Sequence, residues 1–136
     1  MDKLTINWYQ TNWTEIDLHE DTCYYAFTRG STILYIGIAY YQDVIDEVRQ
    51  NLNRFGLSTK GLSIWLGYVD KENTTYGRIT HKIVLDAECM MIHMNEPTYN
   101  TQCKKNYTGR WNFRVVSRNL LEHRISCDEY GVLRYT

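Results

Sequence analysis

Long apolar runs, prolines and closely spaced cysteines are scarce in this chain of 136 residues, and each absence excludes a class of protein. No apolar run approaches the roughly 18 residues of a transmembrane helix, so we expect no membrane span. Residues 1–5 lack a basic region followed by an apolar core, so we expect no signal peptide. One proline and eight glycines exclude collagen-like and low-complexity chains. A net charge of −1, with 23% charged residues, excludes a highly charged disordered chain.

The cysteines are too far apart for a short metal-binding or redox motif. No two of them are separated by two residues, as a zinc knuckle or a dithiol active site requires. Because no signal peptide is expected, we predict reduced thiols in a cytoplasmic protein. The four cysteines are Cys23, Cys89, Cys103 and Cys127.

Charge is distributed unevenly along the chain. Residues 1–100 contain 8 lysines and arginines against 13 acidic residues, whereas residues 101–136 contain 7 against 3. Such a separated basic region indicates either a contact surface for a polyanion or a solvated strand face. Five basic residues and no acid lie between positions 102 and 118, namely Lys104, Lys105, Arg110, Arg114 and Arg118.

Apolar periodicity predicts alternating strands and helices. Residues 22–29 and 32–39 are rich in aromatic and β-branched side chains and predict a hairpin around a tight turn. Residues 42–55 show the spacing of an amphipathic helix, and residues 62–69 read as a third strand. A second helix is predicted over 77–95, where the single proline of the chain ends it.

We therefore predict an α/β (α+β) fold in a single domain. Its centre would be a small, largely antiparallel three-stranded sheet in β-β-α-β-α order, flanked by helices, with a strand-containing C-terminal extension. Residues 1–21 would form an N-terminal arm, residues 22–100 the core and residues 101–136 the basic extension.

The predicted core contains an ordered set of polar motifs. Tyr25 precedes Ala-Phe on the first strand, and Tyr35 begins a Tyr-Ile-Gly segment ten residues later on the second. Glu88 lies on the second helix and is followed by Pro97 and Asn100. Over about residues 20–118 this set resembles the GIY-YIG nuclease superfamily.

The resemblance implies a nuclease that hydrolyses DNA phosphodiester bonds with one divalent metal. Glu88 would be the ligand of Mg²⁺ (or Mn²⁺), an ion that one carboxylate and substrate oxygens can hold. Tyr25 would act as a base or orient water, and Tyr35 would position water or phosphate. Gly37 would let the backbone approach a phosphate closely, and Asn100 would anchor the loop after the helix through hydrogen bonds to backbone.

The helix over 42–55 departs from the family, which usually carries an arginine there and a histidine one turn later. Arg49 and Asn53 take these places if the segment after the second strand is extended, and we predict Arg49 as the cation that binds phosphate. A register two residues earlier would instead place Glu47 and Asn51 there and leave the site without its cation.

The missing histidine has one candidate replacement and leaves a second function open. His81 lies seven residues before Glu88 on the same helix face, so it could carry the proton. The alternative is a catalytically degraded module of the same fold, which binds nucleic acid or a protein partner without cutting. In either case the basic residues from Lys104 to Arg118 would contact DNA phosphates, whether single- or double-stranded. The oligomeric state stays open.

Overall fold

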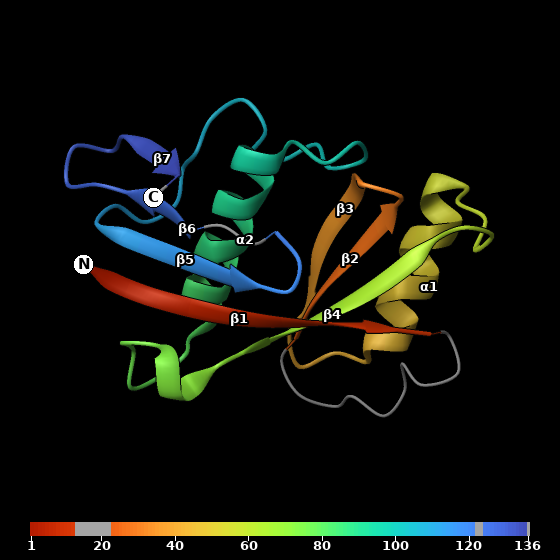
Figure 1. The fold of residues 1–136 in the computed structure, drawn as a ribbon, viewed down its shortest axis with the longest axis horizontal. Coiled ribbons are helices and arrows are strands. Elements are labelled where there is room, and N and C mark those ends of the chain that lie inside the picture. The colour runs from red at the N-terminus through yellow and green to blue at the C-terminus, as the bar shows by residue number, and fades with distance from the viewer. Residues whose placement is uncertain (13–22, 122–123, 136) are drawn as a thin grey trace.

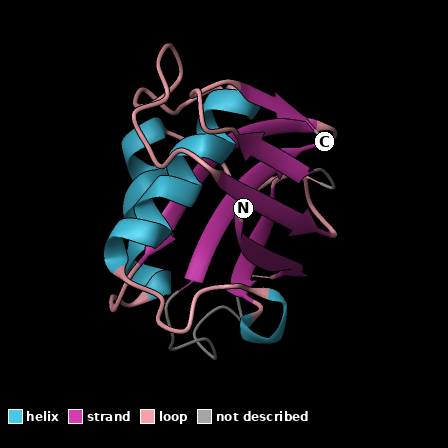
Figure 2. Ribbon diagram, turned by 90° about the vertical axis from the view of Figure 1, so that its left-hand side faces the viewer, coloured by secondary structure: helices cyan, strands magenta, loops and turns pink. Residues whose placement is uncertain are grey.

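A mixed sheet of seven strands organises the protein (Figure 1). The structure is a computed structural model that describes residues 1–12, 23–121 and 124–135. The strands lie in the order β3-β2-β4-β1-β5-β6-β7. Two α-helices pack against the sheet (Figure 2). The elements are β1 (Asp2–Thr11), β2 (Cys23–Arg29), β3 (Thr32–Ala39), α1 (Val44–Phe55), β4 (Ser63–Val69), the 3-10 turn η2 (Lys71–Asn73), α2 (His81–Asn95), β5 (Phe113–Arg118), β6 (Arg124–Cys127) and β7 (Leu133–Tyr135).

The prediction of a small three-stranded sheet is wrong, because β1, β5, β6 and β7 belong to the same sheet as the predicted strands. The β1 strand pairs antiparallel with β4 on one side and parallel with β5 on the other. It is therefore the central strand and not part of an N-terminal arm. Leu4, Ile6 and Trp8 alternate along it and are fully buried, as the two-residue period of a strand requires. Residues 13–21 of the predicted arm lie outside the described residues.

The predicted C-terminal extension is likewise part of the fold. The β5 strand pairs with β1 in parallel, and β6 and β7 continue the sheet beyond it. Phe113 and Val115 of β5 are fully buried in the core cluster that includes α2. Residues 113–135 therefore complete the sheet that the first strand begins.

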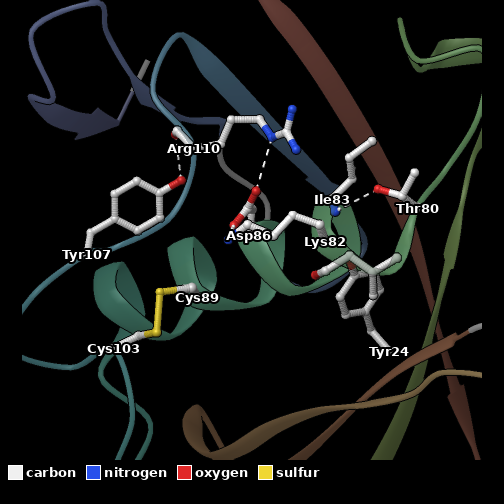
Figure 3. Close-up of polar contacts among 10 residues, drawn as sticks. Tyr24, Thr80, Lys82, Ile83, Asp86, Cys89, Cys103, Tyr107 and Arg110 are labelled. Atoms are coloured by element: carbon white, nitrogen blue, oxygen red, sulfur yellow. Dashed lines mark hydrogen bonds and ion pairs between the residues drawn. A yellow bond between two sulfur atoms is a disulfide. The ribbon is translucent and has the colours of Figure 1, made fainter.

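Both predicted helices are confirmed, with later starts. Asp43 accepts a hydrogen bond from the backbone N–H of Ile45 and caps α1, and Gly56 ends it at φ 63°. Thr80 caps α2 by accepting a hydrogen bond from Ile83 N–H, so the helix begins at His81 (Figure 3). Neither helix in the described parts of the chain combines the length and the hydropathy needed to cross a membrane.

Neighbouring residues on β2 point to the two faces of the sheet and so to the two helices. Tyr24 is fully buried and donates a hydrogen bond to the backbone oxygen of Val84 on α2 (2.8 Å). Tyr25 packs in the second core cluster, with Val48 and Leu52 of α1. This alternation places the phenol of Tyr25, and not that of Tyr24, beside the polar residues of α1.

Candidate functional site

The two tyrosines of the predicted motifs lie side by side on β2 and β3. Their ring centroids are 5.9 Å apart, and a hydrogen bond between the two phenols affects the pKa of each. Tyr25 is only 1% exposed, whereas Tyr35 is half-buried and lines a cavity. Burial raises the pKa of both phenols. Tyr35 can therefore contact a substrate, whereas the buried Tyr25 can only help to position the ring of Tyr35.

The side chains of Glu47 and Asn51 on α1 face Tyr25. This is the second of the two registers considered from the sequence, in which Glu47 takes the place of the family's arginine. The Asn51 side-chain amide donates a hydrogen bond to the Tyr25 oxygen, and a carboxylate oxygen of Glu47 lies 3.5 Å from it. Residues two positions apart on a helix differ by about 200° around its axis, so Arg49 points away from Tyr25 when Glu47 faces it. Arg49 is exposed and does not line the cavity, so the structure does not bring it together with Tyr35 and Glu88.

Glu88 faces a small cavity of about 140 Å³ between α1, α2 and the loop that follows α2. Its side chain is half-buried, and burial raises the pKa of the carboxyl group to about 7. No hydrogen bond or ion pair joins this carboxylate to any residue in the described ranges. Tyr35 lines the same cavity, and the charge of Glu88 adds to the burial that raises the pKa of Tyr35. The site thus contains an uncompensated acid beside a phenol.

Arg54 supplies a cation that the sequence analysis missed. Its side chain lines the cavity with Tyr35 and Glu88, and its positive charge acts against the rise in the pKa of Tyr35. A signal for it exists in the sequence, because positions 47, 51 and 54 share one helix face by their spacing of four and three residues. The guanidinium also lies 5.3 Å from the ring centroid of Phe55, which lines the cavity as well.

Gly37 and Asn100 hold this arrangement in place. A Cβ atom at Gly37 would lie 2.6 Å from the ring of Tyr25 and 2.8 Å from that of Tyr35, so glycine makes room for both rings. This packing accounts for the glycine without a phosphate. The buried Asn100 side chain accepts a hydrogen bond from the backbone N–H of Ile36 (3.0 Å) and donates one to its oxygen (2.9 Å). Asn100 therefore has the anchoring role that the sequence predicts.

His81 is not part of this site. It is the first residue of α2 and is exposed, and its ring stacks on Tyr40 with centroids 4.3 Å apart. Two helical turns separate it from Glu88, and it does not line the cavity. Its prediction as a proton carrier at Glu88 receives no support from this geometry.

Three residues of the predicted DNA-binding stretch have partners within the fold. Arg110 forms an ion pair with the buried Asp86 (Nε–Oδ2 3.0 Å), which Lys82 also contacts (Figure 3). Arg114 donates a hydrogen bond to the Ser126 hydroxyl, and Arg118 pairs with Asp70 (3.3 Å). The acids come from distant parts of the chain, so counting charges along the sequence could not reveal them. Arg110 neutralises a buried carboxylate, and a contact of this residue with DNA stays a prediction.

The remaining two residues lie next to the cavity. Lys104 and Lys105 line an open depression of about 570 Å³ with Glu96, and Thr101 borders both this depression and the Glu88 cavity. A polyanion that reaches Glu88 across Thr101 therefore passes these lysines.

The prediction of reduced thiols is wrong for two cysteines. Cys89 on α2 and Cys103 in the following loop form a disulfide, with Cα atoms 5.4 Å apart (Figure 3). Their separation of 14 residues carries no recognisable motif, so only the fold brings them together. Cys127 is free and buried.

The residues around Glu88 fit a single divalent ion. The unpaired carboxylate faces a cavity that Thr101 and Gln102, two residues with neutral oxygen atoms in their side chains, also line. The parts of the chain that the structure describes contain no cluster of three or more acidic, histidine or cysteine side chains. An ion such as Mg²⁺ keeps several waters and takes one or two carboxylates plus substrate phosphate, so one carboxylate is sufficient.

A larger cavity of about 640 Å³ lies elsewhere, where β4 ends and the chain leads into α2. Tyr41, Tyr68, Tyr76 and Lys71 are among the residues that line it, and none of the lining residues is an acid, a histidine or a cysteine. Comparison of the chain with protein-family models, curated proteins and solved structures finds no match.

Proposed function

We propose that this chain is a metal-dependent nuclease that hydrolyses DNA phosphodiester bonds at the Glu88 cavity. The observation that carries the proposal is the half-buried, unpaired carboxylate of Glu88, which shares a cavity with the phenol of Tyr35 and the guanidinium of Arg54. A carboxylate in such surroundings is costly unless a cation compensates it. The motif resemblance to the GIY-YIG nucleases supports the same reaction.

Phosphodiester hydrolysis needs positive charge on the phosphate, an oriented water and a proton for the leaving oxygen. A divalent ion held by Glu88, when bound, supplies positive charge that stabilises the pentavalent phosphate. Arg54 adds a second positive charge at the same cavity. The Tyr35 hydroxyl borders the cavity and orients the attacking water by hydrogen bonding.

Tyr25 acts as a positioning residue in this mechanism. It is too buried to reach a substrate, and burial raises the pKa of its phenol, so it stays protonated at neutral pH. Its hydroxyl donates a hydrogen bond to a carboxylate oxygen of Glu47 (3.5 Å) and accepts one from the Asn51 side-chain amide. These hydrogen bonds hold the Tyr25 phenol in place beside the ring of Tyr35.

Lys104 and Lys105 would guide the DNA backbone to the cavity. They lie beside Thr101, which connects their depression with the Glu88 cavity. Lysines that contact phosphates bind without reading sequence, so this part of the surface supports affinity rather than specificity.

Nicking of supercoiled plasmid tests the proposal. The wild-type chain should nick plasmid with Mg²⁺ or Mn²⁺ and not with chelator, and Glu88→Gln should remove this activity while it keeps the shape of the side chain. The matched control is Glu72→Gln, which changes an exposed carboxylate outside the cavity. Nicking by Glu88→Gln at the wild-type rate would refute the assignment.

The acid beside Tyr25 favours a second candidate, a module that binds nucleic acid or a protein without cutting. Glu47 lies 3.5 Å from the Tyr25 oxygen, at the position where the family usually has a cation, and its charge repels phosphate. Retention of DNA by the wild-type chain, with no nicking in either metal, would identify this function. Cleavage that depends on Arg54 would exclude it.

A further inference from the structure

One disulfide joins two of the segments that line the Glu88 cavity. Cys89 follows Glu88 on α2, and Cys103 follows Gln102, which lines the cavity from the opposite side. Figure 3 shows the bond between the helix and the loop after it. The covalent link therefore limits how far the loop can move from the carboxylate.

The loop depends on this bond because it contains no helix or strand between residues 101 and 112. Before it, Thr98 and Tyr99 form backbone hydrogen bonds with β3, and after it Arg110 pairs with Asp86. Between these anchors, the described chain gives residues 101–109 one hydrogen bond to another element, from His93 Nδ1 to the backbone oxygen of Cys103 (2.8 Å). Tyr107 in this segment also packs against the main core cluster, so the disulfide is the covalent restraint on the part that carries Thr101, Gln102 and the two lysines.

The two sulfur atoms differ in their access to solvent. Cys89 is 7% exposed, whereas Cys103 is half-buried and lines the open depression of Lys104 and Lys105. A reductant can approach Cys103 through this depression, and the two ammonium groups attract an incoming thiolate. The leaving sulfur is then that of Cys89.

We infer that the Cys89–Cys103 disulfide is a redox switch that holds the loop after α2 in place beside the Glu88 cavity in the oxidised protein and releases the loop on reduction. In the oxidised form, Thr101 and Gln102 stay against the cavity and the lysines stay beside it. In the reduced form, residues 101–109 lose their covalent link to α2. The consequence for DNA cleavage rests on the proposed function, but the opening of the loop does not.

The exchange balances with a small dithiol as reductant. One thiolate of the dithiol attacks Sγ of Cys103 and forms a mixed disulfide, while the bond to Cys89 breaks and Cys89 leaves as a thiolate. The second thiol of the dithiol then displaces Cys103 and closes a cyclic disulfide. Two electrons pass to the protein, which ends with two protonated cysteines, and the dithiol is oxidised.

Limited digestion with trypsin tests the opening without reference to any activity. Peptide bonds after Lys104 and Lys105 should be cut at least about tenfold faster in protein treated with dithiothreitol than in oxidised protein, because local opening exposes the loop. Cys103→Ser should be cut at the fast rate with or without reductant. Cys127→Ser, which changes the free buried cysteine, should keep the wild-type response.

Two results of the digestion would overturn the inference. One is an equal cutting rate at the two lysines in oxidised and reduced protein. The other is cutting on reduction that spreads equally to Arg29 and Arg54, since this pattern indicates global unfolding. A cooperative thermal transition of Cys103→Ser, followed by circular dichroism, supports local opening as the explanation.

Plasmid nicking on the same samples separates the inference from the proposed function. Nicking that falls at least about tenfold on reduction and recovers on reoxidation supports both, because the loop residues contribute to positioning. Opening of the loop with no nicking in either state supports the switch and overturns the nuclease. Opening with the same nicking rate in both states overturns the switch as a control of the site.

Discussion

Replacing Glu88 by glutamine should stabilise the metal-free protein above neutral pH, although it removes the proposed metal ligand. Burial raises the pKa of the Glu88 carboxyl group from its ordinary value of 4.5 to about 7. The folded protein therefore opposes the ionisation that the unfolded chain permits. Glutamine has nearly the same shape and no charge, so it avoids this cost.

The sign and the size of the effect follow from the two pKa values. Between pH 4.5 and about 7, the folded state binds the proton more tightly than the unfolded state, so the contribution of Glu88 to the free energy of unfolding falls as pH rises. Above pH 7 the loss is complete, and at about 1.4 kcal/mol per pKa unit it amounts to roughly 3 kcal/mol. We expect Glu88→Gln to exceed the wild type by about 2–3 kcal/mol at pH 8 and to match it below pH 4, because the neutral acid costs little.

Urea denaturation followed by tryptophan fluorescence, in buffer with chelator, measures this difference at several pH values. The corresponding shift in melting temperature at pH 8 is roughly 6–12 °C for a chain of this size. Glu72→Gln, at an exposed position, should stay within about 0.5 kcal/mol of the wild type throughout. A Glu88→Gln variant less stable than the wild type at pH 8, or a difference that does not change with pH, would refute the reasoning. Either result would mean that the carboxylate is paired in solution.

Three further predictions test the site. Arg54→Ala should lower the rate of plasmid nicking by about 10²–10³-fold, whereas Arg49→Ala should not. The opposite result would favour the register of α1 in which Arg49 faces the site. Asn100→Ala should lower the free energy of unfolding in urea by about 2–3 kcal/mol, because two buried hydrogen bonds to the backbone of β3 are lost; a loss below about 0.5 kcal/mol would contradict the anchoring role. Changing Lys104 and Lys105 together to alanine should reduce the slope of log affinity against log salt by roughly two units in DNA-binding anisotropy, and an unchanged slope would remove these lysines from the interface.

The choice of register on α1 shows where the sequence stops being informative. The helical period over 42–55 is clear, but a helix can be turned so that either Arg49 or Glu47 faces Tyr25. The decision depends on the connection from β3, which ends at Ala39, to the cap at Asp43. This connection has no regular period that would fix the rotation of the helix about its axis, so only the three-dimensional structure shows which side chains face Tyr25.

The number of strands in the sheet could not be predicted for a similar reason. Leu4, Ile6 and Trp8 show the alternation of a strand, yet polar residues between them favoured an irregular arm. The pairing of Asp2 with Phe113 joins positions that are more than a hundred residues apart, and nothing local indicates such a partner. Local signals therefore identified the strands of the hairpin, where the partners are neighbours in the chain.

A count of charges along the sequence does not show ion-pair partners that come from other elements. The basic stretch contains no acid of its own, and the fold brings Asp86 to Arg110 and Asp70 to Arg118. The pattern of Glu88, Pro97 and Asn100 does identify a residue with a structural role, because the Asn100 side chain forms two hydrogen bonds with the backbone of Ile36.

The central position of β1 has a consequence for how the protein is synthesised. One edge of this strand finds β4 early, but its other edge stays open until residues 113–118 have left the ribosome. Pairing between such distant segments makes folding slow in comparison with a helical chain of the same length. During that interval the unpaired edge can recruit a strand from another nascent chain. We therefore expect the yield of soluble protein to depend on translation speed and on chaperones that cover the edge.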